Sequence, residues 1–329
     1  MTINKVAVIG LGSIGRRHLR IISEIRPDIK IIVVRSGKGA TCSEESIATK
    51  IVYSVADAIQ CGVQAAIVSS PATLHLEQAK ELAKNNVHLL IEKPLSSVSD
   101  GIDQLSKTVI NNKIVAIIGY AFRYDKGAIK FKEWLSSKIV GKILHARIEC
   151  GSYLPEWRPD QDYRKTVSAS RELGGGVLLE LSHELDYLYW FFGKPVDVVA
   201  NIRNSNSLDV NVEDQADLLV TSQDGYPISV QLDFARRNNV RICKVLTTEG
   251  ELVWDAINRT VTLRAVNNEP EIYTYKNDKD YIYRQQMESF FECIDQDIEP
   301  TVSVLDGLDV MKLIDAARLA ADKGCKIEL

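Results

Sequence analysis

The chain has 329 residues, 45% of them hydrophobic and 26% charged, which is typical of a globular protein and long enough for two domains. A formal charge of −4 gives no electrostatic reason to expect binding to nucleic acid or to an anionic membrane. No apolar run approaches the ~20 residues of a membrane span, "MTINKVAVIG" leaves no room for a signal peptide, and the six cysteines are scattered, so we expect a cytoplasmic protein with reduced thiols.

The first part of the chain, residues 1–121, alternates short apolar runs with amphipathic helical patterns, as repeated β-α-β units do. Strands this continuously apolar are expected in a parallel sheet that is covered on both faces, which predicts a doubly wound Rossmann domain that binds a dinucleotide. The predicted strands are 5–10, 30–34, 65–70, 87–93 and 113–121, and the predicted helices are 14–25, 74–86 and 98–112.

Residues 122–329 show a different pattern, which predicts an α+β domain with a large, mostly antiparallel sheet for substrate binding and oligomerisation. A helix at 126–138 and an alternating strand at 142–153 precede a long loop and an apolar helix at 177–192. A series of strand-like runs then extends from 196 to 275, and helices at about 278–295 and 304–323 close the chain.

A glycine-rich stretch, "VIGLGSIG", directly follows the first predicted strand and opens a helix. In this G-x-G-x-x-G spacing Gly10 permits a tight turn, Gly12 lets the backbone approach a pyrophosphate, and Gly15 lets helix and strand pack closely. Ser13 and Ile14 begin the helix whose N-terminus would face the phosphates. The alternative is a glycine-rich turn that binds nothing.

The end of the second predicted strand is where an acid would bind the ribose 2′-hydroxyl of NAD. Here the chain has Arg35, Ser36 and Lys38 instead, a set suited to a 2′-phosphate, so we predict that NADP(H) is favoured over NAD(H). The alternatives are an arginine that stacks on adenine without contacting the phosphate, and a solvated loop.

The stretch "LLIEKPLSS" places Glu92 and Lys93 at the carboxyl end of a buried strand, where ligands of doubly wound sheets bind. A lysine near the nicotinamide could polarise or protonate a substrate oxygen as hydride moves. Pro94 restricts the backbone behind it. The alternative is an ordinary loop lysine.

The apolar helix "VLLELSHELDYLYWFF" carries His183 among acidic residues. Residues three apart share a helix face, so Glu180 could orient the imidazole, and a neutral His183 could accept the proton of a hydroxyl. The alternative is a core histidine bonded to a backbone carbonyl. A zinc motif H-E-x-x-H is excluded because Tyr187 stands in place of the second histidine, and we predict no metal.

Aromatic and guanidinium side chains suit sugar rings and anionic groups. The loop 153–176 holds several of them, and one more follows the last predicted Rossmann strand. We therefore predict a substrate-binding set, with a solvated surface loop as the alternative; its members are Trp157, Arg158, Tyr163, Arg164 and Arg123.

Four stretches occur in the order and spacing of one known family: "VAVIGLGSIGRRHL", "SSPATLHLEQA", "IEKPLS" and "GGGVLLELSHELDYLYWFFG". Over essentially its whole length the chain resembles the glucose–fructose oxidoreductase / inositol dehydrogenase / MocA (Gfo/Idh/MocA) family of NAD(P)-dependent oxidoreductases. The resemblance implies a homo-oligomer, either a homodimer or a homotetramer, packed through the outer face of the antiparallel sheet. It also implies hydride transfer between nicotinamide and the carbinol or carbonyl carbon of a sugar, sugar acid, cyclitol or nucleotide sugar. Two alternatives remain: a non-catalytic dinucleotide-binding regulatory protein, and a reductase of a non-sugar ketone or imine.

The resemblance also assigns residues. It implies that Lys93 lies beside the nicotinamide, and that His183 is catalytic, with Asp186 three residues later at the substrate. A further set contacts the cofactor, namely Ser69, Ser70, Pro71 and His75. The chain departs from the family at the aspartate that commonly stands four residues before the histidine. Leu179 occupies that slot when counted back from His183, and Glu180 occupies it when counted forward from the glycines at 174–176.

Overall fold

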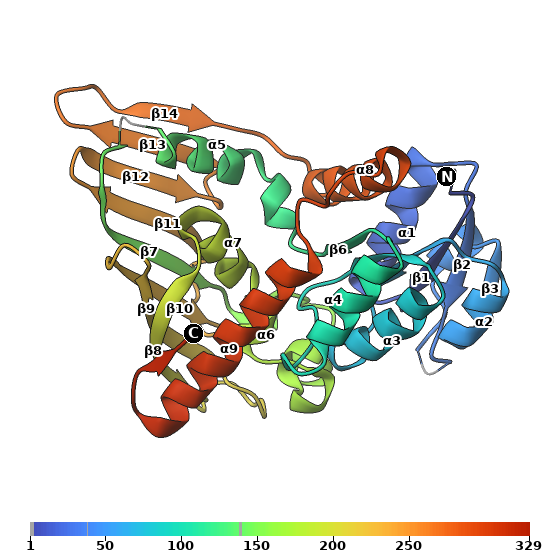
Figure 1. Ribbon diagram of the computed structural model, residues 1–329. Coiled ribbons are helices and arrows are strands. Elements are labelled where there is room, and N and C mark those ends of the chain that lie inside the picture. The colour runs from blue at the N-terminus through green and yellow to red at the C-terminus, as the bar shows by residue number, and fades with distance from the viewer. Residues whose placement is uncertain (1–2, 38, 138–139) are drawn as a thin grey trace. The chain divides into compact units, whose positions relative to one another are not determined.

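The structure, a computed structural model, describes residues 3–37, 39–137 and 140–329, and the chain forms two compact units (Figure 1). Unit 1 comprises Met1–Ala121 and Lys279–Met311, and unit 2 comprises Phe122–Asp278 and Lys312–Leu329. The sequence predicted a second domain running unbroken from 122 to 329. In the structure, residues 279–311 return to the first unit.

Unit 1 contains a six-stranded sheet of order β3-β2-β1-β4-β5-β6 in which every pair of neighbours is parallel. This is the strand order of a dinucleotide-binding Rossmann sheet. The strands are β1 (Lys5–Ile9), β2 (Lys30–Val34), β3 (Lys50–Val52), β4 (Ala65–Val68), β5 (His88–Ile91) and β6 (Ala116–Ile118). The order reverses between β1 and β4, so a crevice for a ligand is expected at their carboxyl ends.

The helices of unit 1 connect and cover these strands. They are α1 (Ser13–Ile25), α2 (Val55–Gln60), α3 (Ala72–Lys84), α4 (Ile102–Asn111), α8 (Tyr281–Gln296) and the first part of α9 (Val304–Lys323). A short 3-10 helix, η1 (Ser43–Ile47), lies between β2 and β3. The sequence did not predict β3 or α2, because elements of so few residues show little periodicity.

The core of unit 1 explains why α8 belongs to it. One cluster of buried residues joins α1 and α8 to β1, β2, β4 and β5; it includes Val6, Val8, Leu19, Ile22, Val33, Ile67, Leu90, Met287, Phe290 and Phe291. Full burial of a side chain of this size contributes about 1.5–3 kcal/mol. The apolar face of α8 is therefore part of the Rossmann core, although most of unit 2 separates it from the other strands and helices in the sequence.

Unit 2 contains a nine-stranded sheet of order β14-β13-β12-β11-β7-β10-β9-β8-β15. β7 and β10 are parallel and the other neighbours are antiparallel, which confirms the predicted mostly antiparallel sheet. The strands are β7 (Ile143–Gly151), β8 (Pro195–Arg203), β9 (Gln215–Ser222), β10 (Pro227–Asp233), β11 (Val240–Thr247), β12 (Gly250–Asp255), β13 (Thr260–Ala265), β14 (Glu271–Thr274) and β15 (Ile327–Glu328).

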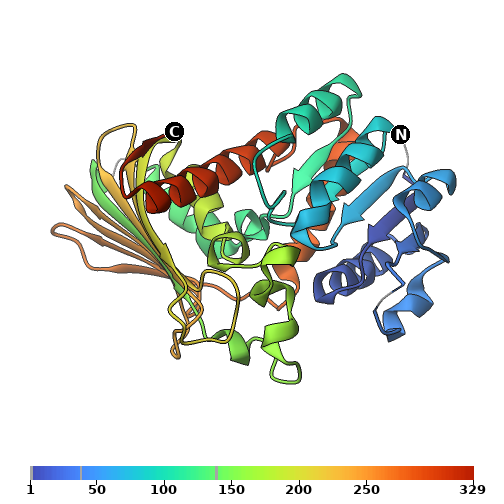
Figure 2. The same cartoon turned by 90° about the horizontal axis from the view of Figure 1, so that it is seen from below.

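The helices of unit 2 lie on one side of this sheet, as Figure 2 shows for the sheet seen nearly edge-on. They are α5 (Lys126–Leu135), α6 (Val177–Glu180) and α7 (His183–Phe192), with the C-terminal part of α9. An aromatic cluster packs α5 and α7 on β12: the Tyr187 ring meets Trp254 at 5.2 Å and the Phe131 ring meets Phe191 at 4.8 Å between centroids. These contacts fix α7, the helix that carries His183.

Candidate functional site

The glycine loop of unit 1 joins β1 to α1. Gly10 has φ +88°, and a Cβ atom there would lie 2.9 Å from the backbone oxygen of Ser69; a Cβ on Gly15 would lie 2.0 Å from the oxygen of Gly10. A Cβ on Gly12 would meet nothing within 4 Å. Among the described residues no side chain caps the start of α1 and none is acidic in its first turn, so the protein supplies no anionic acceptor there for the first N–H groups. An uncapped helix start behind an open glycine fits a pyrophosphate.

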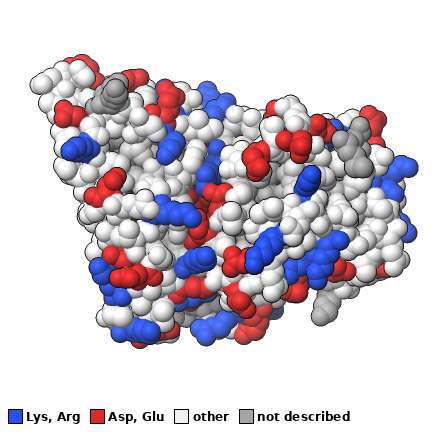
Figure 3. All heavy atoms as spheres, viewed as in Figure 1, with Lys and Arg blue, Asp and Glu red and all other residues white. Residues whose placement is uncertain are grey.

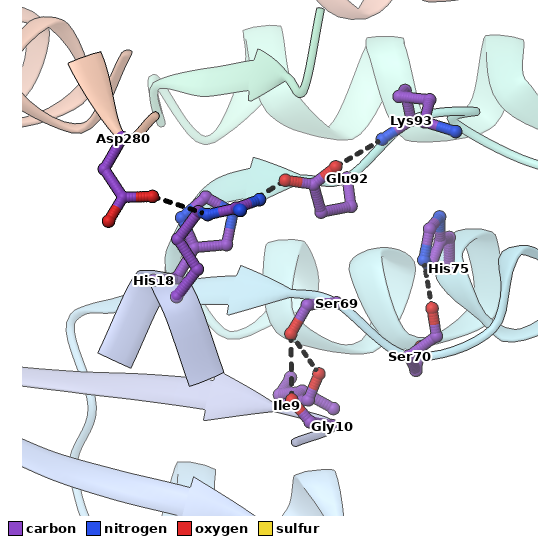
Figure 4. A network of polar contacts seen from close by, with 10 residues as sticks. Ile9, Gly10, His18, Ser69, Ser70, His75, Glu92, Lys93 and Asp280 are labelled. Carbon is purple, nitrogen blue, oxygen red and sulfur yellow. Dashed lines mark hydrogen bonds and ion pairs between the residues drawn. The ribbon is translucent and has the colours of Figure 1, made fainter. Parts of the chain in front are cut away.

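The end of β4 lies against this loop. The hydroxyl of Ser69 donates hydrogen bonds to the carbonyl oxygens of Ile9 at 2.9 Å and of Gly10 at 3.0 Å (Figure 4). Ser70 donates to Gln78 on α3 at 2.6 Å, and Pro71 is the N-cap of that helix. The predicted cofactor loop is thus adjacent to the glycine loop, at the point where the strand order of the sheet reverses.

His75 connects this loop to the one that carries Lys93. Its ring nitrogens lie 2.7 Å from the carbonyl oxygen of Ser70 and 2.8 Å from that of Pro94. Burial lowers the pKa of His75, so the neutral ring donates to only one of the two carbonyls at a time. His75 therefore organises the loops and is 2% exposed, which leaves little of it for a direct cofactor contact.

Glu92 and Lys93 follow β5 at the same carboxyl edge of the sheet, and the Lys93–Pro94 peptide bond is cis. The Glu92 carboxylate lies 2.6 Å from Nε2 of His18 on α1 and accepts a hydrogen bond from the backbone N–H of Lys93 at 3.2 Å (Figure 4). Burial alone would raise the pKa of Glu92, but the hydrogen bond from His18 and nearby positive charge outweigh it and lower the pKa. The buried Glu92 thus accepts from the backbone of Lys93 and helps to fix it, while the Lys93 residue is partly exposed.

Sequence reasoning missed His18. A signal was present, because His18 stands on the buried face of α1 with Gly15, Leu19 and Ile22, where an apolar residue would be expected. A fully buried imidazole needs a hydrogen-bond partner, and the partner is 74 residues away in the chain.

The side chain of Arg35, which follows β2, donates hydrogen bonds to residues of the segment between β2 and β3. Its Nη1 donates to the carboxylate of Glu45, and its Nη2 donates to the carbonyl oxygens of Gly39 at 2.7 Å and Ala40 at 2.8 Å. Ser36 follows it, and Lys38 lies outside the described residues. The guanidinium that was expected to bind a 2′-phosphate therefore already has a carboxylate partner.

In unit 2 the predicted helix 177–192 is interrupted. α6 ends at Glu180 and α7 begins at His183, with Leu181 at φ −99° and ψ 30° between them. The expectation that Glu180 and His183 share a helix face three residues apart is wrong, because no continuous helix joins them. Glu180 stays a prediction that rests on the family's pattern alone.

His183 is the first residue of α7 and is 8% exposed. The ring of Phe122 meets it edge-on at 5.1 Å, and the guanidinium of Arg241 lies over Phe122 at 4.4 Å from the ring centre. Arg241 also donates to the buried carboxylate of Glu184 at 2.7 Å. A charged pair and an aromatic ring thus hold the first turn of α7, and no pattern in the sequence indicated that β11 supplies this arginine.

Arg123 and Asp186, both expected to bind substrate, bind one another. Nε and Nη2 of Arg123 each donate to an oxygen of Asp186 at 2.8 Å, and the two residues are 8% and 1% exposed. Arg123 also lies over the ring of Trp190 at 5.2 Å. The two-pronged donor face of Arg123 thus already holds a carboxylate, and its role toward an anionic substrate group stays a prediction.

The predicted residues of the loop 153–176 make contacts within unit 2, and their role toward a substrate stays a prediction. Arg164 is exposed and pairs with Asp162 at 2.8 Å and Asp209 at 3.4 Å, and Arg158 is exposed. Trp157 donates to Ser152 at 2.7 Å and packs edge-on against Phe234 at 5.2 Å. The hydroxyl of Tyr163 accepts from the backbone of Asp209 at 3.5 Å. These contacts fold the loop onto unit 2.

Within the part of the chain that the structure describes, no group of three or more histidine, cysteine, aspartate or glutamate side chains could hold a metal ion. In the same residues no helix is both long and apolar enough to cross a membrane.

Two family models match the chain over most of its length. Residues 4–120 match the oxidoreductase family with an NAD-binding Rossmann fold, and residues 129–253 match the Gfo/Idh/MocA C-terminal domain. The chain belongs to the Gfo/Idh/MocA family. This confirms the resemblance in the sequence, and the strand order and glycine loop of unit 1 are those of the family's NAD-binding domain.

Two known proteins are similar to the chain at low identity. A 2,7-anhydro-N-acetylneuraminate hydratase from Mediterraneibacter gnavus is 27% identical, over 57% of this chain and 49% of the hydratase. An inositol 2-dehydrogenase/D-chiro-inositol 3-dehydrogenase from Halalkalibacterium halodurans is 23% identical over 98% and 92% of the two chains. For the hydratase and one other relative, the matched segment spans only about half of that protein's length.

A solved structure of levoglucosan dehydrogenase with NADH and levoglucosan has a TM-score of 0.87. It covers 99% of this chain and 98% of that one at 17% identity, which shows a shared fold.

Proposed function

We propose that the chain is a nicotinamide-dependent dehydrogenase that acts on a CH–OH group of a sugar, sugar acid, cyclitol or nucleotide sugar. The observation that carries the proposal is the position of Lys93. It follows β5 at the carboxyl edge of the sheet whose β1–α1 loop has an uncapped helix start behind Gly12. The relatives that are named as inositol and levoglucosan dehydrogenases support a polyhydroxylated substrate.

The reaction requires a hydride and a proton to leave the same CH–OH group. When bound, the nicotinamide supplies the hydride acceptor. We assign to the ammonium or amine of Lys93 the hydrogen bond to the reacting oxygen, and to the imidazole of His183 the uptake of the hydroxyl proton. The buried pair of His18 and Glu92 fixes the backbone from which Lys93 extends.

A substrate screen tests this proposal. Purified protein is mixed with NAD⁺ or NADP⁺ and a panel of polyols, anhydrosugars, sugar acids and nucleotide sugars, and the absorbance of reduced nicotinamide is followed. We expect turnover with at least one class, and loss of turnover in Lys93→Ala. Tight dinucleotide binding without oxidation of any class, or reduction of non-sugar ketones alone, would contradict it. The first outcome would favour a regulatory dinucleotide-binding protein.

For the cofactor, the predicted preference for NADP(H) rested on Arg35, Ser36 and Lys38. The engagement of Arg35 by Glu45 does not support it, and the family model describes an NAD-binding fold. We therefore propose that NAD(H) binds at least as tightly as NADP(H). Fluorescence titration of both reduced cofactors measures this, and clearly tighter binding of NADPH would restore the original prediction.

We also propose that the chain forms a homodimer or homotetramer through the bare face of the unit 2 sheet. One row of paired residues crosses that face: Val199, Leu219, Ser229, Arg147, Lys244, Val253, Thr262 and Ile272. Leu219 and Ile272 are 51% and 62% exposed. Leu219→Lys should dissociate the oligomer in sedimentation analysis, whereas Leu305→Lys, at an equally exposed position on α9, should not.

No nucleic-acid or membrane partner is proposed, because basic and acidic side chains are interspersed on the face in Figure 3. A reducing, cytoplasmic location is proposed because all six cysteines are free thiols. Cell fractionation with thiol trapping tests the location.

A further inference from the structure

The loop after β2 combines an arginine and a glutamate in one partly buried pair. Arg35 directly follows Val34, whose carbonyl oxygen accepts from the N–H of Gly10 at 3.0 Å, so Arg35 stands beside the glycine loop. Its guanidinium donates to Glu45, Gly39 and Ala40. The side chains of Arg35 and Glu45 are 11% and 18% exposed, so water screens their attraction less than at an open surface.

Glu45 is held in place from both ends. It is the third residue of η1, where its carboxylate accepts from the backbone N–H of Cys42 at 3.1 Å while its own N–H donates to the carbonyl oxygen of Cys42 at 3.2 Å. The bond from the Cys42 N–H is the glutamate half of a capping box, and it holds the Glu45 side chain without the help of Arg35. Its neighbour Glu44 points elsewhere and pairs with Arg20 on α1 at 2.6 Å.

Arginine after β2 would ordinarily serve a 2′-phosphate, and a carboxylate there would serve a 2′-hydroxyl. In this chain both charges are present and neutralise one another. A 2′-phosphate would have to displace the Glu45 carboxylate from Arg35 and then lie beside that anion. A 2′-hydroxyl carries no charge and meets neither cost.

We propose that Glu45, from the segment that follows the β2 loop, is a cofactor-specificity residue that holds Arg35 and thereby disfavours NADP(H). The inference rests on the proposed function in one respect: the dinucleotide must occupy the loop from Gly10 to Gly15. The inference names Glu45 as the residue that sets the preference between NAD(H) and NADP(H). It also explains how NAD(H) can bind although no acidic residue stands directly at the end of β2.

The test is a binding measurement and needs no substrate. Dissociation constants for NADH and NADPH are titrated by nicotinamide fluorescence for the wild-type chain, Glu45→Gln, the matched control Glu44→Gln, and the double variant Glu45→Gln/Arg35→Gln. Glu45→Gln should tighten NADPH relative to NADH by roughly tenfold to a hundredfold, the range of one charge-assisted hydrogen bond. Glu44→Gln should leave the ratio unchanged, and the double variant should lose the gain.

An unchanged ratio in Glu45→Gln would overturn the inference. If that variant does not fold by circular dichroism, Glu45→Ala takes its place, and an unchanged ratio in Glu45→Ala would overturn the inference in the same way. If the wild-type chain binds neither dinucleotide, the proposed function fails and this inference fails with it.

Discussion

His18 on α1 and Glu92 after β5 form a buried contact of 2.6 Å between Nε2 and Oε1, with exposures of 0% and 5%. The pair connects the helix that begins at the glycine loop with the residue that precedes Lys93. Because removing one partner strands the other charge in the core, the pair is stabilising only while both members remain.

We predict that His18→Met lowers the free energy of unfolding at pH 7 by about 3–5 kcal/mol, and that His18→Gln, which keeps a donor near the Nε2 position, loses much less. The native pKa of Glu92 is lowered, so its stabilising contribution is present above its unfolded pKa of about 4.3 and is lost as pH falls through the native value. The difference between the two variants should therefore shrink below about pH 4. Denaturant unfolding at pH 7 and below about pH 4 measures this difference in the free energy of unfolding. Equal stability of the His18→Met and His18→Gln variants at pH 7 would show that the contact contributes nothing.

Lys93→Ala should lower kcat by ~10²–10⁴-fold, the usual loss for a positioned acid or base, while the dissociation constant of the cofactor changes little. The proposed pyrophosphate site consists of backbone groups of the β1–α1 loop, which the substitution does not change. Lys107→Ala, at an exposed position on α4, is the control. Near-normal kcat, or activity lost only through failure to bind cofactor, would make Lys93 a structural or cofactor-binding residue.

His183→Ala should reduce kcat by a similar factor, and the double variant with Lys93→Ala should be little worse than the worse single one, because residues that serve one step are strongly non-additive. The unfolding temperature should fall as well, since the ring is buried and packs against Phe122, so kcat is compared at a temperature where each variant is folded. His145→Ala on β7 is the control. If the loss of kcat in the double variant equals the product of the two single losses, the two residues serve separate steps.

Arg123→Leu should destabilise unit 2 by about 3–5 kcal/mol, because Asp186 would keep a buried carboxylate with its main partner removed. Arg123→Leu/Asp186→Leu should recover most of the loss, since an apolar pair of similar volume can replace a buried ion pair. Thermal unfolding of the three proteins checks this. A stable Arg123→Leu with a selectively raised KM would return Arg123 to the role of a substrate-binding residue.

Local pattern was sufficient for the longer elements of the Rossmann unit, although not for β3, α2 or the return of residues 279–311. Continuous apolar runs mark strands that are covered on both faces, and the glycine spacing has one known structural context, so β1, α1, β4 and β5 were predicted within a few residues. In unit 2, the alternation of apolar and polar residues likewise predicted a series of strands. The position of Lys93 at a strand end also followed from order along the chain. The break of the helix between Glu180 and His183 was not visible, because the apolar pattern runs through it without a proline or a glycine.

Charged partners were decided only by tertiary structure. Arg35 looked like a phosphate ligand and Arg123 like a substrate ligand, because a sequence shows a charge but not the charge opposite it. Their partners, Glu45 and Asp186, lie 10 and 63 residues away, and folding of the loop in one case and of α7 in the other brings them within hydrogen-bond distance. The sequence by itself thus determined the strands and where reactive side chains follow them. The packing of distant elements determined which of those side chains remain available to a ligand, because desolvated charges must be paired within the fold.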